Sequence, residues 1–210
     1  MQKVKESLLD DLDTIDSNIS DNIVKDIAKY IKQNYYPCKT TISDEPSADG
    51  KYIINVHSGL AAKVNIKNLT NGHFKFGTVD KGFDISNCYQ LKSLEGAPRE
   101  VYGLWISEHA GIDSLVGAPD YVGSSVYLSG CLNLTSLEGC PGEIHGLLQL
   151  DGCNDLDIDA KYLPHKMVGG HLVLTNTKYD IKNNGKIDSK LKNWMSKSGC
   201  EFIRTSKNKI

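Results

Sequence analysis

Four residues that recur at a regular spacing could bind a metal ion. Cys88, His109, Cys131 and Cys153 follow one another at intervals of 21 or 22 residues, and thiolate sulfur and imidazole nitrogen are common zinc ligands. On equivalent positions of successive strands, however, they would lie along a line at about 4.8 Å per step. Because a tetrahedral site needs ligands that converge on one point, we expect a buried structural column and no metal.

Histidines and carboxylates in adjacent segments suggest a second kind of chemistry. His145, His165 and His171 could meet Asp151 or Asp159 and form a general acid–base pair. The sequence contains no phosphate-binding glycine loop, nucleophile elbow, dinucleotide-binding glycine pattern or HExxH motif. We therefore expect a non-enzymatic protein with no catalytic residues and no cofactor.

Three related hexapeptides indicate how the chain is organised. They have the pattern Ser-Leu-x-Gly-x-Pro, occupy residues 93–98, 114–119 and 136–141, and are spaced by 21 and 22 residues. Self-similarity at this period is typical of a solenoid, in which each repeat buries its apolar face against its neighbours. Glycine allows a positive φ and proline fixes φ, so the hexapeptide is a structural turn.

The apolar residues follow the same period. Each repeat has an apolar pair separated by one residue, then a Cys, His or Thr three positions later. In the first four repeats a Leu or Ile follows three positions further on. The pairs are Phe83/Ile85, Leu104/Ile106, Val126/Leu128, Leu148/Leu150 and Leu172/Leu174. This pattern resembles the leucine-rich repeat family, and its Ser-Leu-Glu-Gly-Ala-Pro form resembles repeats in bacteriophage-encoded proteins.

The resemblance implies an α+β fold, a leucine-rich-repeat solenoid with a parallel β-sheet. We expect one short strand per regular repeat over 83–174, within a solenoid spanning 51–178. A helical cap over 1–36 and a helix–strand cap over 179–210 would cover its ends, all in one cooperative domain. Residues 40–50 read as a loop and 189–198 as a helix capped by Asp188. The register of the segments before residue 83, with strands at 52–56, 64–66 and 74–76, stays open.

The residue between the two members of each apolar pair, and the polar residues near it along the strand, are expected to point away from the core, because side chains alternate across a strand. We expect a binding surface there that combines large aromatic residues with acidic ones, as binding hot spots do. Its candidate residues are Asp84, Trp105, Glu108, Tyr127, Gln149 and Asp151. The alternative is that Trp105 and Tyr127 simply cover the sheet.

Charge is distributed unevenly along the chain. Residues 82–160 carry twelve acidic residues against two basic ones, a net charge of −10, whereas residues 181–210 carry a net charge of +6. An acidic surface favours a partner protein with a basic surface. Basic residues interleaved with aromatic ones are absent from the repeats, so nucleic acid is expected only weakly, at the C-terminal basic tail.

These observations predict a protein-binding module, and the phage resemblance implies an antagonist that occludes a basic surface of a host defence or toxin protein. Two alternatives remain: an enzyme or small-ligand binder with a pocket near the irregular N-terminal repeats, and a structural component of an assembly.

No apolar run is long enough to span a membrane. Without a secretion signal, and with six cysteines that form no CxxC pair, we expect free thiols and a cytoplasmic protein, in the host cytoplasm if phage-encoded.

Overall fold

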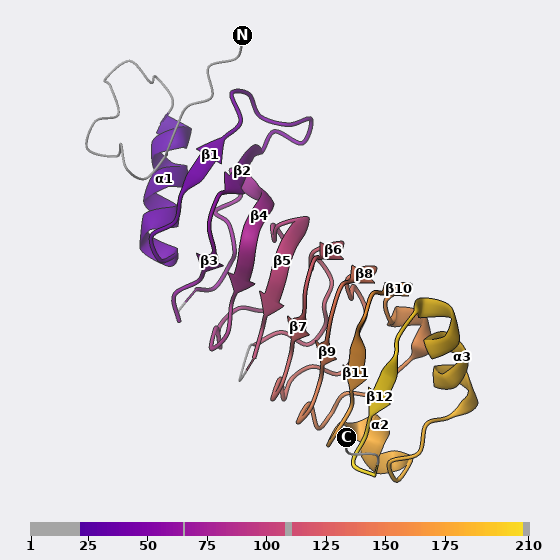
Figure 1. Ribbon diagram of the computed structural model, residues 1–210. Coiled ribbons are helices and arrows are strands. Elements are labelled where there is room, and N and C mark those ends of the chain that lie inside the picture. The colour runs from indigo at the N-terminus through magenta and orange to yellow at the C-terminus, as the bar shows by residue number, and fades with distance from the viewer. Residues whose placement is uncertain (1–21, 65, 108–110, 208–210) are drawn as a thin grey trace.

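A computed structural model describes residues 22–64, 66–107 and 111–207 and shows strands stacked one after another along a single axis (Figure 1). Helix α1 (Asn22–Asn34) lies at the N-terminal end of the stack, and helices α2 (Lys178–Lys182) and α3 (Ser189–Ser198) lie at the other end. The solenoid with a parallel sheet that the repeats predict is confirmed, and its described part is mostly β-structure.

The strands belong to one twelve-stranded sheet. The first five are β1 (Thr40–Ile42), β2 (Tyr52–Val56), β3 (Leu60–Ala61), β4 (Phe74–Asp84) and β5 (Glu100–Trp105). The shorter strands that follow are β6 (Tyr121–Val122), β7 (Val126–Tyr127), β8 (Glu143–Ile144), β9 (Leu148–Gln149), β10 (Lys166–Met167), β11 (His171–Val173) and β12 (Phe202–Arg204).

The repeats after β5 contain two short strands each, β6/β7, β8/β9 and β10/β11, whereas β4 and β5 are the single strands expected. The first half of β5 pairs with β6, which continues through β8 to β10, and its second half pairs with β7, which continues through β9 and β11 to β12. All these pairs are parallel. Between β6 and β7, the Ser125 hydroxyl accepts a hydrogen bond of 3.1 Å from the Leu147 N–H. A side chain therefore takes the place of a backbone carbonyl where the strand is interrupted.

The predicted apolar pairs form the core of the solenoid. Both residues of every pair, from Phe83/Ile85 to Leu172/Leu174, have no exposed surface. Their registers agree, because Phe83 lies opposite Leu104, Leu104 opposite Val126, and Val126 opposite Leu148. Each repeat therefore buries its pair against the same pair of its neighbours.

The hexapeptide turns stack closely on one another. Gly96, Gly117 and Gly139 have φ values of 85°, 90° and 83°, and a Cβ atom at Gly139 would overlap the backbone of Leu115 in the preceding turn. Ser93 and Ser136 each accept a hydrogen bond of 3.0 Å from the backbone N–H two residues on. The structural role predicted for the hexapeptide is confirmed.

The N-terminal end differs from expectation in two places. Residues 40–42, expected within a loop, form β1, which pairs antiparallel with β2 and is the outermost strand. The strand expected at 64–66 is replaced by β3, and Val64 lies in a turn. Helix α1 packs its apolar face inward through Val24, Ile27 and Ile31. The helix predicted before residue 22 lies outside the described residues.

The C-terminal end is held by a buried carboxylate. Asp180, in α2, is 1% exposed and accepts hydrogen bonds from the Asn176 N–H at 3.1 Å and from the Ser206 N–H and hydroxyl at 3.2 Å. These bonds join α2 to the segment that follows β12. The predicted helix over 189–198 is confirmed as α3, and Asp188 caps it by accepting from the Leu191 N–H at 2.8 Å.

Truncation of one core residue tests this packing. We expect Leu128→Ala to lower the free energy of unfolding by about 2–5 kcal/mol, because it opens a cavity between stacked repeats. Leu132, four residues later, is 45% exposed. Leu132→Ala is therefore the matched control, and we expect it to change the free energy of unfolding by about 0.5 kcal/mol or less. Urea denaturation measures both. Similar losses in the two variants would contradict the assigned core.

Candidate functional site: an aromatic face on the sheet

The predicted outward residues form one row across the parallel strands. Asp84 lies opposite Trp105, Trp105 opposite Tyr127, Tyr127 opposite Gln149 and Gln149 opposite Val173. The row ends at Arg204, opposite Val173 on β12. Asp151 belongs to the neighbouring row, two residues after Gln149. Glu108, the sixth candidate, lies outside the described residues.

Trp105 is half-buried because its indole rests on two glycines of the sheet, which have no side chains. Its indole lies across Gly82 and Gly103: a Cβ atom at Gly82 would overlap the ring, and one at Gly103 would lie 2.6 Å from it. The Tyr127 ring stacks beside the indole, with centroids 5.7 Å apart and an angle of 13° between the planes. The two rings therefore cover the sheet, as the alternative interpretation of the sequence has it, and also form an aromatic surface, whose binding role stays a prediction.

A shallow hollow lies beside Trp105 at the N-terminal end of this row. It has a volume of about 420 Å³ and is lined by Tyr36, Pro37, Leu60, Gly82, Asp84 and Trp105, among others. Most of these side chains are apolar. Asp84 contributes the only carboxylate among the lining residues, and its Oδ1 accepts a hydrogen bond of 2.9 Å from the Ser86 N–H. The hollow could accept an apolar side chain that carries a basic group.

The other end of the row is more polar. The Asp151 Oδ1 atom accepts hydrogen bonds from the Gln149 amide at 2.7 Å and from the Ser129 hydroxyl at 2.8 Å. With His171 and Arg204, Gln149 and Asp151 line a hollow of about 280 Å³. The carboxylate is thus fixed in position by residues of two repeats.

Two further tyrosines of the same sheet point away from the core and were missed in the sequence. Tyr102, on β5, is 59% exposed, and Tyr121 lies opposite Glu100 and Glu143 on the flanking strands. Both alternate with buried valines, Val101 and Val122, which is the sequence signal for an outward position. We call Tyr102, Trp105, Tyr121 and Tyr127 the aromatic face. Strands β5 to β9 around it contain two glutamates and no lysine or arginine.

Much of the acidic charge of the repeats is neutralised locally. Glu143 pairs with Lys166 at 2.7 Å, Asp120 with Arg99 at 3.4 Å, and Asp159 with Lys161 at 3.2 Å. Asp157 pairs with Lys182 of the basic C-terminal segment at 3.8 Å. The net charge of −10 is therefore not presented on one surface. Asp84 and Asp151 lie toward the two ends of the row that contains Trp105 and Tyr127, and Glu100 and Glu143 lie on either side of Tyr121.

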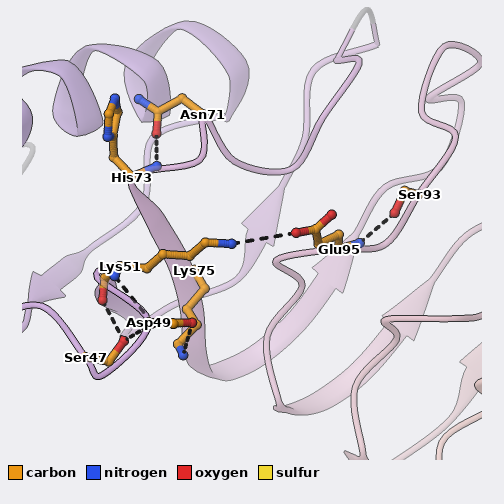
Figure 2. A network of polar contacts seen from close by, with 8 residues as sticks. All are labelled: Ser47, Asp49, Lys51, Asn71, His73, Lys75, Ser93 and Glu95. Atoms are coloured by element: carbon orange, nitrogen blue, oxygen red, sulfur yellow. Dashed lines mark hydrogen bonds and ion pairs between the residues drawn. The ribbon is translucent and has the colours of Figure 1, made fainter.

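A polar network joins the irregular segment to the first hexapeptide (Figure 2). Lys51 lies 3.6 Å from the Glu95 carboxylate, and Lys75 donates to Asp49 at 2.9 Å. Hydrogen bonds from Ser47 and Lys75 hold the pKa of Asp49 well below its ordinary value. This network is exposed and linear, so it aligns neighbouring turns and does not enclose a ligand.

The cysteine column is structural, as predicted. The Cys131 thiol donates to the Ile106 carbonyl at 2.7 Å and the Cys153 thiol to the Leu128 carbonyl at 2.9 Å, each to the preceding repeat. His109 lies outside the described residues. Burial raises the pKa of Cys88 to about 11, and a hydrogen bond with Cys153, together with burial, holds the pKa of Cys131 far above its ordinary value. Within the described ranges, no three His, Cys, Asp or Glu residues are grouped as metal ligands.

The histidines do not meet the carboxylates suggested by the sequence. His145 contacts Glu143, and its ring lies 5.2 Å from that of Tyr121 in an edge-on arrangement. His171 lies 3.8 Å from Glu201, and His165 is exposed. The acid–base pair with Asp151 or Asp159 is therefore not formed.

Comparison with protein-family models, with curated proteins and with solved structures gives no match to this chain. Among the helices of the described residues, none has the length and apolar character needed to cross a membrane. We therefore infer function from the geometry of the surface.

The thiols provide a test of the column. We expect Cys88, Cys131 and Cys153 to resist alkylation in the native protein at neutral pH, because all three side chains are buried and a reagent cannot reach them, and to react after unfolding. We expect no stoichiometric zinc and no change of melting temperature on addition of a chelator. Mass spectrometry and metal analysis measure these quantities. One zinc per chain that is lost in Cys131→Ser would overturn the structural assignment.

A glycine substitution tests how Trp105 is seated. Gly103→Ala should displace the indole, change its fluorescence and near-ultraviolet circular dichroism, and lower the free energy of unfolding by about 1–3 kcal/mol through overpacking. Gly59→Ala is the control, because a Cβ atom there would meet only the Gly82 carbonyl at 3.6 Å. Unchanged spectra in Gly103→Ala would show that Trp105 does not rest on this glycine.

Proposed function

We propose that this chain is a non-enzymatic protein-binding module that docks its aromatic face on a basic surface of a partner protein. The observation that carries the proposal is the stacked Trp105–Tyr127 pair, seated on a sheet face whose strands β5 to β9 contain no basic residue. Aromatic residues dominate the centres of protein interfaces because they bury large areas at small entropic cost.

The mode of action is steric occlusion. Tyr102 and Tyr121 extend the aromatic face beyond the stacked pair, and Asp84 and Asp151 stand at its two ends. Complementary charge speeds the encounter of two proteins, whereas buried aromatic contacts slow their separation. A partner whose basic surface is covered in this way would lose access to its own anionic substrate.

A finer proposal rests on the resemblance of the three hexapeptides to leucine-rich repeats of bacteriophage-encoded proteins. On that basis the chain is a phage-type inhibitor and the partner a bacterial defence or toxin protein, encountered in the host cytoplasm. Enzymes that process nucleic acids have basic clefts, which an acidic and aromatic surface fits. A role as a structural component of an assembly would use the same face and is distinguished by its stoichiometry.

Substitutions on the face test the proposal once a partner is captured from bacterial lysate. We expect Tyr102→Ala and Trp105→Ala each to hasten dissociation, with a loss of about 2 kcal/mol or more at a hot spot. Charge reversal by Asp84→Lys or Asp151→Lys should mainly slow association, and this effect should shrink at high salt. Rate constants measured at two salt concentrations give these quantities.

Two controls keep this test specific. Val116 is exposed in a hexapeptide turn, away from the aromatic face, so Val116→Ala should leave both rate constants unchanged. Trp105→Ala uncovers glycine backbone and costs stability, so melting curves accompany it, and the exposed Tyr102 provides the variant that should fold normally. Full binding by both tyrosine and tryptophan variants would show that the interface lies elsewhere.

A further inference from the structure

A second hollow lies at the N-terminal end, between the end of α1 and the strands β2 to β4. It has a volume of about 740 Å³, within the range of about 300–1,000 Å³ typical of small-ligand sites. The lining residues that matter for its chemistry are Lys32, Tyr36, Pro37, Lys39, Lys63 and Lys81. We call it the lysine hollow.

The charged side chains that line the lysine hollow are all basic. Four lysines line the hollow, and none of its described lining residues is acidic. Lys63 is fixed, because its ammonium donates to the Lys32 carbonyl at 2.9 Å, near the end of α1. A carboxylate next to the lining, that of Asp80, lies 3.2 Å from the His57 Nδ1 atom. Like charges held together repel one another, and a bound anion would relieve that repulsion.

An aromatic ring stands beside these charges. The Tyr36 ring is 54% exposed, yet its backbone is fixed, because the Tyr36 N–H donates to the Ala61 carbonyl at 3.0 Å. Tyr36 and Pro37 line the lysine hollow and also the hollow beside Trp105. A positioned, exposed ring next to lysines is the arrangement that binds a planar base and its phosphates.

We propose that the lysine hollow binds a nucleoside polyphosphate. Lys39 and Lys81, whose side chains are exposed, hold the phosphate oxygens as point charges, and Tyr36 stacks against the base. The site adjoins the hollow beside Trp105 through Tyr36 and Pro37, but its binding of a small anion does not depend on the protein-binding function. The proposal develops the alternative of a small-ligand binder with a pocket near the irregular N-terminal repeats, because the lysine hollow lies in that part of the chain.

Calorimetric titration of the full chain with ATP, inorganic triphosphate and adenosine tests the proposal. We expect ATP to bind most tightly, triphosphate more weakly and adenosine not measurably. Lys39→Gln and Lys81→Gln should each weaken ATP binding about tenfold or more, as expected for a lost charged hydrogen bond. Tyr36→Ala should weaken ATP binding at least about fivefold and leave triphosphate binding unchanged.

Lys192→Gln is the control, because Lys192 is an exposed lysine of α3 at the opposite end of the chain. Equal weakening by Lys192→Gln would identify non-specific attraction and overturn the site, as would the absence of saturable ATP binding. Triphosphate binding as tight as ATP would overturn the role of the base. Tighter binding of a ten-nucleotide single-stranded RNA, with the same dependence on Lys39 and Lys81, would overturn the small ligand in favour of a nucleic-acid strand.

Discussion

The parallel register between successive repeats is the constraint on which the rest of this structure depends. A single repeat, with an apolar pair such as Val126 and Leu128, cannot bury that pair alone. Burial comes only when the same pair of the next repeat lies directly opposite, and the hexapeptide turns make this possible. Gly117 and Gly139 allow each turn to approach the backbone of the preceding one. A side chain at Gly139 would therefore force its turn away from the preceding one.

The same register orders residues that take no part in the core. Because each strand is aligned with the next, the position between the apolar pairs becomes a row on the outer face, from Asp84 through Trp105 and Tyr127 to Arg204. The thiols become a column on the inner side, and each donates to a carbonyl of the repeat before it. A linear array suits a long contact with a protein surface and is poorly suited to a metal site or a catalytic group, both of which need convergence.

Periodicity made the repeats predictable, whereas contacts outside the period were not. The apolar pairs, the turns and α3 follow from local spacing, glycine and a capping aspartate, and they lie where expected. Between β6 and β7 a serine hydroxyl replaces a backbone acceptor, and β1 depends on pairing with β2. The seating of Trp105 depends on glycines in two different strands, and ion pairs such as Asp157–Lys182 join distant segments. No local pattern encodes these long-range contacts.

Departure from the repeat is what creates space for a ligand. The regular repeats fill their own interior and leave smaller hollows outside, such as the one of about 280 Å³ beside Asp151, whereas the segment from α1 to β3 does not follow the period and leaves the larger lysine hollow. Tyr36 and Pro37 separate that hollow from the one beside Trp105, so the two proposed sites share a wall. If a ligand stacked on Tyr36 changes how this wall meets a partner at Trp105, thermodynamic linkage requires the partner to change ligand affinity by the same factor. The irregular segment thus places a hollow lined by lysines next to one that contains Asp84, with Tyr36 and Pro37 common to both.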